Sequence, residues 1–281
     1  FTQFYNAARC CPTRASLLTG TYPHEAGIGH MMGNYGISQY QGKLSSNVIT
    51  IPEVLKKAGY STIMSGKWHL TKNDLDQWPL KRGFDNFYGL ISGAANYFKS
   101  EYPGLIFEGN EKININDENY YTTDAFTDKA IEYIDKVKSE NSEKPFFLYL
   151  SYNAPHWPLQ APKENIDKYR GNYMKGWENL REERYKRMIE MGLIDSSWDL
   201  SYDDIVSWDS LSKEKREEMD LRMAIYAAMI DRMDQNIGRL IKDLKSKGLY
   251  DNTIIMFLND NGACAENDML GSGPKEQLET K

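Results

Sequence analysis

The stretch Tyr60–His69, YSTIMSGKWH, decides the fold class of this sequence. Its first half, residues 60–64, predicts a short buried strand, and this strand runs into the polar end GKWH. Just before it, Thr50 and Glu53 have the spacing of a capping box, which predicts the start of a helix that Gly59 ends. A helix therefore leads into a buried strand, and the strand ends in polar side chains.

The same order of helix, apolar strand and polar strand end recurs twice further along the chain. Apolar residues at helical spacing predict a helix over residues 122–138, and the next strand is predicted at Pro145–Tyr152. A long helix is predicted over residues 213–247, followed by a third apolar strand at Thr253–Leu258. The alternation predicts the α/β class, with a mainly parallel central sheet and helices on both faces.

Polar side chains follow each of the three predicted strands. In open α/β sheets the ligand crevice lies at the carboxyl ends of the strands. We therefore expect one crevice to contain the residues that follow the strands, namely Lys67, His69, His156, Asp260 and Asn261.

Composition excludes several classes of function. The formal net charge of the 281 residues is −6, which argues against a protein that binds nucleic acid through its phosphates. No run of 18 apolar residues is present, so no membrane span is predicted, and no signal peptide is visible. Three cysteines form no disulfide framework. The first residue is Phe1 rather than Met, so we expect the natural N-terminus to lie upstream.

Two segments do not follow the alternation of helices and strands. Residues 74–120 are rich in glycine, asparagine and aromatic residues, and residues 172–209 are rich in tyrosine, tryptophan and charge. Both are expected to be insertions over the active-site edge of a single domain that covers residues 1–281. Aromatic loops in that place suit sugar or aryl substrates, although long loops also use aromatic residues simply to pack against the protein.

The stretch ARCCPTRASLLTG, residues 8–20, contains two of the three cysteines. A short helix is predicted from about Pro12 to a stop at Gly20. Cys10 thus lies at a helix start, with Arg14 one turn later, an arrangement suited to an anion. A thiolate phosphatase needs Cys-x5-Arg, and the spacing here is Cys-x3-Arg. A zinc site needs further cysteine or histidine ligands close by, and none has a suitable spacing.

The run CCPTRASLLTG resembles the motif of the type I sulfatases, Cys-x-Pro-Ser/Thr-Arg-x-x-x-Leu-Thr-Gly, at every fixed position. GKWH, APHWPLQAP and NDNG resemble later blocks of the same family, in the right order. The resemblance implies the fold of the alkaline phosphatase superfamily. It also implies that Cys10 is oxidised to formylglycine by a sulfatase-modifying enzyme, while Cys11 occupies the variable position.

The family resemblance also implies a role for each candidate residue. Asp260, Asn261 and the modified Cys10 correspond to ligands of calcium, Ca²⁺, with Mg²⁺ as the alternative. Arg14 and Lys67 correspond to the groups that bind the sulfate oxygens. His69 corresponds to the histidine at the diol of the hydrated aldehyde, and His156 to the one at the leaving oxygen.

The implied activity is hydrolysis of a sulfuric ester of an aryl alcohol or a carbohydrate, in a periplasmic, secreted or otherwise exported protein. A phosphonate or phosphate ester hydrolase of the same superfamily and an inactive anion-binding fragment are the alternatives. An upstream strand with an Asp pair, a later lysine and a C-terminal subdomain of the family are not matched here, and Lys275 and Lys281 fit no motif. His24 and His30 are expected to support the pocket, and Cys264 has no assigned role.

Overall fold

A computed structural model describes residues 4–72, 74–101, 104–201, 205–263 and 270. Cys264, Lys275 and Lys281 lie outside the described residues. The chain, for which the sequence predicted one domain, divides into two compact units. One consists of Tyr5–Pro158 and Met233–Gly262, and the other is built around Leu159–Arg232. Every candidate site residue belongs to the first unit.

The first unit contains a five-stranded sheet with the order β4-β3-β2-β1-β5. Strand β1 pairs in parallel with β2 on one side and with β5, at the edge of the sheet, on the other. The short strands β3 and β4 extend the sheet in antiparallel pairs. The expected parallel arrangement is therefore confirmed for β2, β1 and β5, and the sheet as a whole is mixed. The strands are β1 (Ser61–Lys67), β2 (Asn86–Leu90), β3 (Ile106–Glu108), β4 (Glu111–Lys112) and β5 (Phe146–Ser151).

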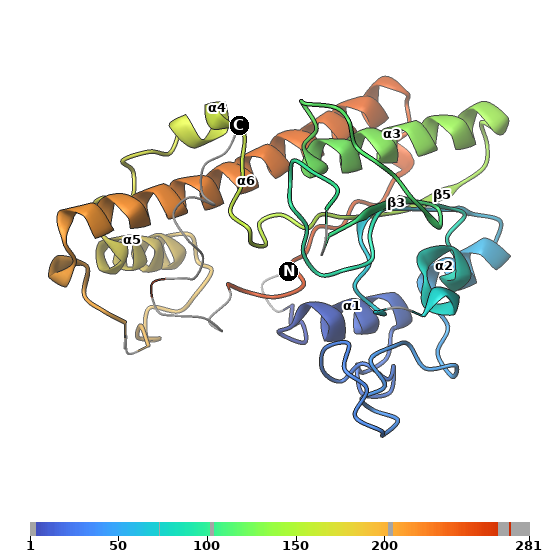
Figure 1. The fold of residues 1–281 in the computed structure, drawn as a ribbon, viewed down its shortest axis with the longest axis horizontal. Coiled ribbons are helices and arrows are strands. Elements are labelled where there is room, and N and C mark those ends of the chain that lie inside the picture. The colour runs from blue at the N-terminus through green and yellow to red at the C-terminus, as the bar shows by residue number, and fades with distance from the viewer. Residues whose placement is uncertain (1–3, 73, 102–103, 202–204, 264–269, 271–281) are drawn as a thin grey trace. The chain divides into compact units, whose positions relative to one another are not determined.

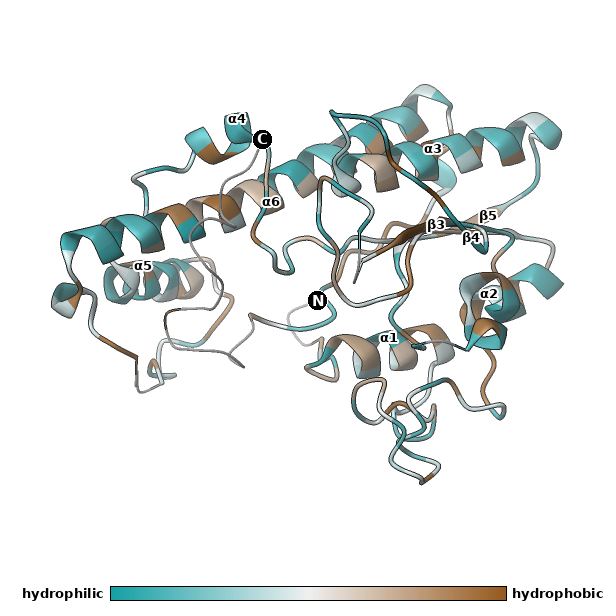
Figure 2. Cartoon of the chain, in the orientation of Figure 1, coloured by the Kyte–Doolittle hydropathy of each residue, from teal (hydrophilic) through white to brown (hydrophobic). Residues whose placement is uncertain are grey.

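Helices cover both faces of this sheet, as the sequence predicted (Figure 1). On one face, α3 (Thr122–Glu140) buries Phe126, Ile134 and other apolar residues against the strands. On the other face lie α1 (Cys10–Thr19) and α2 (Ile51–Lys57), and α1 packs into a second apolar cluster. Figure 2 shows the resulting pattern, with an apolar β3 and a largely hydrophilic outer side of α3.

The remaining helices are α4 (Lys163–Asp167), α5 (Trp177–Glu190) and α6 (Lys213–Ser246). The long helix predicted over residues 213–247 is confirmed as α6, whereas α4 and α5 were not predicted from the sequence. The segment 172–209 lies in the second unit and contains α5. In the described part of the chain, no helix combines the length and the apolar character that crossing a bilayer requires. The described residues also form short 3-10 helices, namely η1 (Leu75–Gln77), η2 (Pro79–Arg82), η3 (Trp208–Ser210) and η4 (Tyr250–Asn252).

The segment 74–120, expected to be an insertion over the sheet edge, instead supplies β2, β3 and β4 to the sheet itself. Aromatic residues of this segment pack on both faces of the sheet. Phe87 packs into the apolar cluster on the α1 face, and Tyr88 packs into the cluster on the α3 face. An aromatic residue on each face of a strand is typical of a strand covered on both sides.

The strand predicted at Thr253–Leu258 is wrong for this structure. These residues form neither helix nor strand, and Ile254 and Met256 are 88% and 80% exposed. A strand is defined by its hydrogen bonds to a neighbouring strand, and among the described residues no strand pairs with this segment.

Candidate active site

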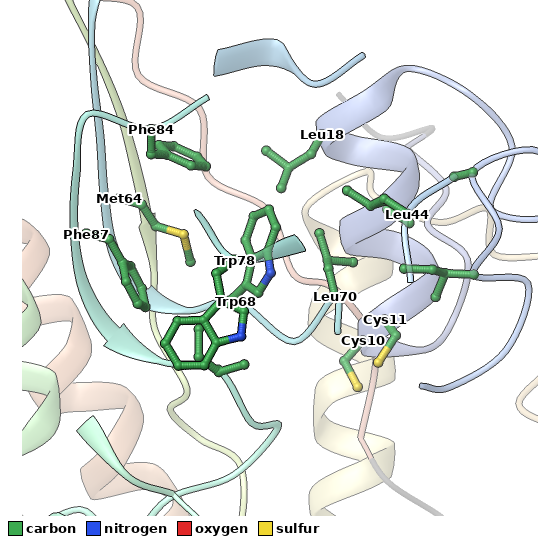
Figure 3. Close-up of a cluster of buried hydrophobic side chains, with 14 residues drawn as sticks. Cys10, Cys11, Leu18, Leu44, Met64, Trp68, Leu70, Trp78, Phe84 and Phe87 are labelled. Carbon is green, nitrogen blue, oxygen red and sulfur yellow. The ribbon is translucent and has the colours of Figure 1, made fainter. Parts of the chain in front are cut away.

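Cys10 is the first residue of α1, where the helix N–H groups have no partners within the helix. The helix ends as predicted, because Gly20 has a φ of 67° and its N–H donates to the carbonyl of Ser16. The first turn is buried, including Cys10, Cys11 and Pro12. Figure 3 shows both thiol groups at the same end of α1, beside the apolar cluster. The positive end of the helix dipole therefore favours negative charge at Cys10.

Arg14 joins three segments that are far apart in the sequence. Its Nη1 donates to the main-chain oxygen of Lys67 at 2.6 Å, and its Nε donates to Asp260 Oδ2 at 2.8 Å. The side chain is buried, and a buried guanidinium is tolerated only where it is paired and hydrogen-bonded. Arg14 thus holds the start of α1, the end of β1 and the segment before Gly262 together.

Lys67 is the last residue of β1 and is almost completely buried. Burial, and then the charge of Arg14, lowers the pKa of Lys67 to about 8, while Cys10 and Asp260 oppose the shift. Two basic side chains, Arg14 and Lys67, therefore act on the same small region around Cys10.

His69 follows β1 with a backbone φ of 56°, in the left-handed region that few non-glycine residues adopt. Its ring lies against Gly93, where a Cβ atom would be 2.4 Å from His69 Cε1. Burial is the main cause that lowers the pKa of His69, and a hydrogen bond with Cys10 opposes it. His69 Nδ1 is buried and has no hydrogen-bond partner among the described residues. A strained backbone and a tight cradle thus hold a buried imidazole beside Cys10.

The two neighbouring thiols shift each other's pKa in opposite directions. A hydrogen bond from Cys11 is the main cause that holds the pKa of Cys10 far below its usual range, and the same bond raises the pKa of Cys11. Burial opposes the shift of Cys10, whereas His69 and Lys67 add to it. The lowered pKa of the Cys10 thiol agrees with the place of Cys10 at the helix start.

His156 lies in the loop after β5. Its Nδ1 is 2.8 Å from the carbonyl oxygen of Trp157, which can only accept, so Nδ1 carries a proton and donates. Its main-chain N–H donates to Asn153, and its own carbonyl accepts from the hydroxyl of Tyr97 at 2.8 Å. Burial, and then the charge of Lys67, lowers the pKa of His156. The ring is therefore fixed with Nε2 as the atom that can gain or lose a proton.

Asp260 and Asn261 are the predicted metal ligands. Asp260 is paired with Arg14, with Arg14 Nη2 2.7 Å from Oδ2, whereas the Asn261 amide donates to the carbonyl of Gly262. The two side chains offer the oxygen atoms that a hard cation prefers, but calcium takes about six to eight oxygen ligands. These residues alone therefore do not make a complete calcium site.

Direct contacts thus bring five of the predicted residues together, namely Cys10, Arg14, Lys67, His69 and Asp260. His156 is close enough for the charges of Lys67, Cys10 and Asp260 to shift its pKa. Asn261 is next to this group along the chain, and its contact is with Gly262. His24 Nε2 lies 3.1 Å from the Tyr40 hydroxyl and His30 Nε2 lies 3.2 Å from Arg9 Nη1.

Three groups at this site were not predicted from the sequence. Tyr149 lies 3.4 Å from Arg14, Met31 Sδ lies 4.0 Å from Cys10 Sγ, and Gly93 receives the ring of His69. No local pattern marks a tyrosine or a methionine as a site residue. Gly93 lies in the stretch ISGAAN, residues 91–96. A glycine followed by small residues is a sequence signal that another side chain can pack close to the backbone there.

The model of the Sulfatase family matches residues 1–280 of the chain. An uncharacterised sulfatase of Schizosaccharomyces pombe is 39% identical over 285 residues, which cover 93% of this chain and 51% of that protein. An arylsulfatase of Klebsiella aerogenes is 33% identical over 93% of this chain and 58% of its own length. The structure of Ps i-CgsB in complex with k-i-k-neocarrahexaose has a TM-score of 0.59 and 26% identity, over 88% of this chain and 47% of that one. The chain spans about half the length of these relatives.

Proposed function

The chain belongs to the sulfatase family, and on this premise we propose that it hydrolyses a sulfuric ester of an aryl alcohol or a carbohydrate through a formylglycine made from Cys10. One observation supports this most: the side chain at the start of α1 is flanked by two basic groups, Arg14 and Lys67, that act on the same point. Such a site suits a tetrahedral anion held at the nucleophile.

Formylglycine, once hydrated, supplies one hydroxyl that attacks sulfur and a second hydroxyl whose deprotonation allows sulfate to leave. The chain's own residues serve this chemistry. Arg14 and Lys67 bind the sulfate oxygens, and the positive end of α1 adds to their field. His69 takes the proton from the second hydroxyl, because its buried neutral imidazole is available as a base.

His156 serves the leaving alcohol. Its Nδ1–H is held by the carbonyl of Trp157, so the proton for the departing oxygen comes from Nε2 of the doubly protonated ring, which returns to the neutral Nδ1–H form. A phenol of low pKa can leave as its anion and depends little on this proton. A sugar hydroxyl is a much weaker acid, so it depends on the proton much more.

Sulfatases of this family use a divalent metal, and we propose calcium for this chain, with Mg²⁺ as the alternative. Asp260, Asn261 and the modified Cys10 would supply oxygen ligands of the kind that either ion prefers. These ligands are too few for calcium by themselves, and no step above is assigned to the ion.

The proposed partners are a sulfated small molecule or glycan and the sulfatase-modifying enzyme. Cys10, Pro12 and Arg14 are buried in the folded chain, so an enzyme that reads this motif must act before α1 is packed. By its family we also infer that the protein is exported, to the periplasm or out of the cell.

The test compares rates on para-nitrophenyl sulfate, para-nitrophenyl phosphate and a phenyl phosphonate ester, using protein in which peptide mass spectrometry has shown Cys10 to be formylglycine. We expect the sulfate ester to be hydrolysed fastest, and Cys10→Ala to abolish turnover. Faster hydrolysis of the phosphate or phosphonate ester would support the alternative hydrolase. Modified protein that binds sulfate but cleaves none of the three esters would show an anion-binding protein instead.

A further inference from the structure

Cys10, Cys11 and His69 form a cluster of metal-ligand side chains that the sulfatase reaction does not use as such. Their ligand atoms all lie within 4.8 Å of one another, and all three side chains are buried. Met31 adds a thioether, with Sδ 4.0 Å from Cys10 Sγ. Figure 3 shows the two cysteine sulfur atoms side by side at the end of α1. The sequence argued against a zinc site because no further cysteine or histidine has a suitable spacing, but the end of β1 brings His69 to the cysteines.

The dimensions of the cluster suit one ion. A metal–sulfur bond of about 2.3 Å places two ligands of the same ion at most about 4.6 Å apart. With three or four ligands around one ion the sulfur atoms lie about 3.8–4.0 Å apart, so a pair at the 4.8 Å limit of this cluster has to close by about 1 Å. One ring nitrogen of His69 lies within 4.8 Å of both sulfur atoms, and Nδ1 is buried without a hydrogen-bond partner among the described residues.

The ligand types select the ion. Thiolate and thioether sulfur are soft ligands, which favour Cu⁺ and, for thiolates, zinc. The charges of Lys67 and Arg14 act directly on the two thiols. Repulsion between these groups and a bound cation is proportional to the cation's charge, so a monovalent ion is opposed half as strongly as a divalent one. Attraction to two thiolates grows with the cation's charge in the same way, so charge does not decide between the ions. The thioether of Met31 beside Cys10 is what favours Cu⁺ over zinc.

We propose that the chain, before Cys10 is converted, binds one Cu⁺ ion through Cys10, Cys11 and His69, with Met31 as a fourth ligand. Conversion of Cys10 removes its sulfur, so copper binding and formylglycine formation exclude each other. A copper-loaded chain cannot be matured at Cys10, and a matured chain has lost the copper site.

The experiment uses the 281-residue chain with Cys10 as the thiol, made in a host without the modifying enzyme and kept reduced and anaerobic. Cu⁺ is supplied as its coloured complex with bicinchoninate, and transfer to the protein is read as loss of colour. We expect one Cu⁺ per chain to be taken from the chelator, and zinc at the same concentration not to displace it. Ag⁺, a probe of the same charge that undergoes no redox change, should slow alkylation of Cys10 by iodoacetamide.

Variants separate the ligands from the fold. Cys11→Ser keeps the size of the side chain and should weaken Cu⁺ binding by about tenfold or more. Met31→Leu should weaken it less. Met64→Leu is the matched control, because Met64 belongs to the same apolar cluster but lies apart from the cysteines in Figure 3, and it should bind as the parent does. Thermal unfolding without metal checks that each variant is folded.

Failure of the chain to take Cu⁺ from the chelator, or equal binding by a folded Cys11→Ser variant, would overturn the proposal. Displacement of Cu⁺ by equimolar zinc would overturn the choice of ion. None of these measurements uses sulfatase activity. A chain that binds Cu⁺ as expected but cleaves no sulfate ester after maturation would therefore contradict only the proposed function.

Discussion

For His156, one experiment can distinguish proton donation to the leaving alcohol from a role in supporting the loop. Because its Nε2 is the atom left to exchange a proton, we expect His156→Ala to slow esters of weakly acidic alcohols far more than esters of acidic phenols. General acid catalysis typically contributes about 10²–10⁴-fold, which sets the range of the loss. The measurement is kcat/KM across a series of aryl sulfates with leaving groups of different pKa. An equal loss over the whole series would show that His156 only supports the loop.

Lys67 gives the site a pH dependence of known sign. Its pKa is lowered to about 8, chiefly by burial, so the charged form dominates below pH 8 and is lost above it. We expect KM for a sulfate ester to rise as the pH passes through about 8, since the anion then loses one of its two cationic partners. Lys67→Arg keeps its charge throughout, so its KM should stay flat over the same range. The same rise in KM in the Lys67→Arg variant would assign the effect to another group.

At the scale of the elements, the close approach of β1 to its neighbours shapes the edge that carries the site. Gly66 has a φ of 119°, and a Cβ there would lie 2.0 Å from the carbonyl oxygen of Ser151. We expect Gly66→Ala to destabilise the fold by more than the about 1–2 kcal/mol that a left-handed backbone alone costs, because the strands must also separate. Urea unfolding measures this.

Gly59 is the matched control for that substitution. It has a φ of 87° but no atom within 4 Å of an added Cβ, so Gly59→Ala carries the backbone cost without the clash. Equal destabilisation by the two substitutions would mean that the strands adjust freely and that the close approach has no energetic role.

The sequence predicted those elements whose signals are local. The capping box of Thr50 and Glu53 is present in the structure, and the αL stop at Gly20 is in place. Strand β2 was missed because five residues with two aromatics do not differ locally from a packed loop. The opposite error at Thr253–Leu258 has the same cause: an apolar run shows the tendency to form a strand, but only a neighbouring backbone makes it one.

The candidate site, like the fold, was predicted from the sequence only where the signal is local. Residues after strands or at a helix start, such as Lys67 and Cys10, could be found from their positions and from the family motif. The contacts of Tyr149, Met31 and Gly93 depend on distances between segments that no spacing along the chain reveals.

At the scale of the whole chain, the supply of oxygen ligands limits calcium binding. Asp260 and Asn261 are the predicted oxygen ligands, and the Asp260 carboxylate is already engaged by Arg14. We expect the 281-residue chain to bind calcium with a Kd of about 10⁻³ M or weaker, in or beyond the weakest range of protein calcium sites. Isothermal titration calorimetry at low ionic strength gives this value.

Arg14→Ala tests the reason for that weakness. Removal of the guanidinium frees Asp260 and takes away a nearby positive charge, so calcium affinity should rise, while sulfate affinity should fall because an anion partner is lost. Arg82→Ala is the matched control: Arg82 is also a buried arginine paired with a carboxylate, Glu53, but it lies away from the candidate site. It should leave both affinities unchanged in the folded protein. Micromolar calcium binding by the parent chain would show that other oxygen atoms of this chain complete the site, and that Asp260 and Asn261 are only part of its ligand set.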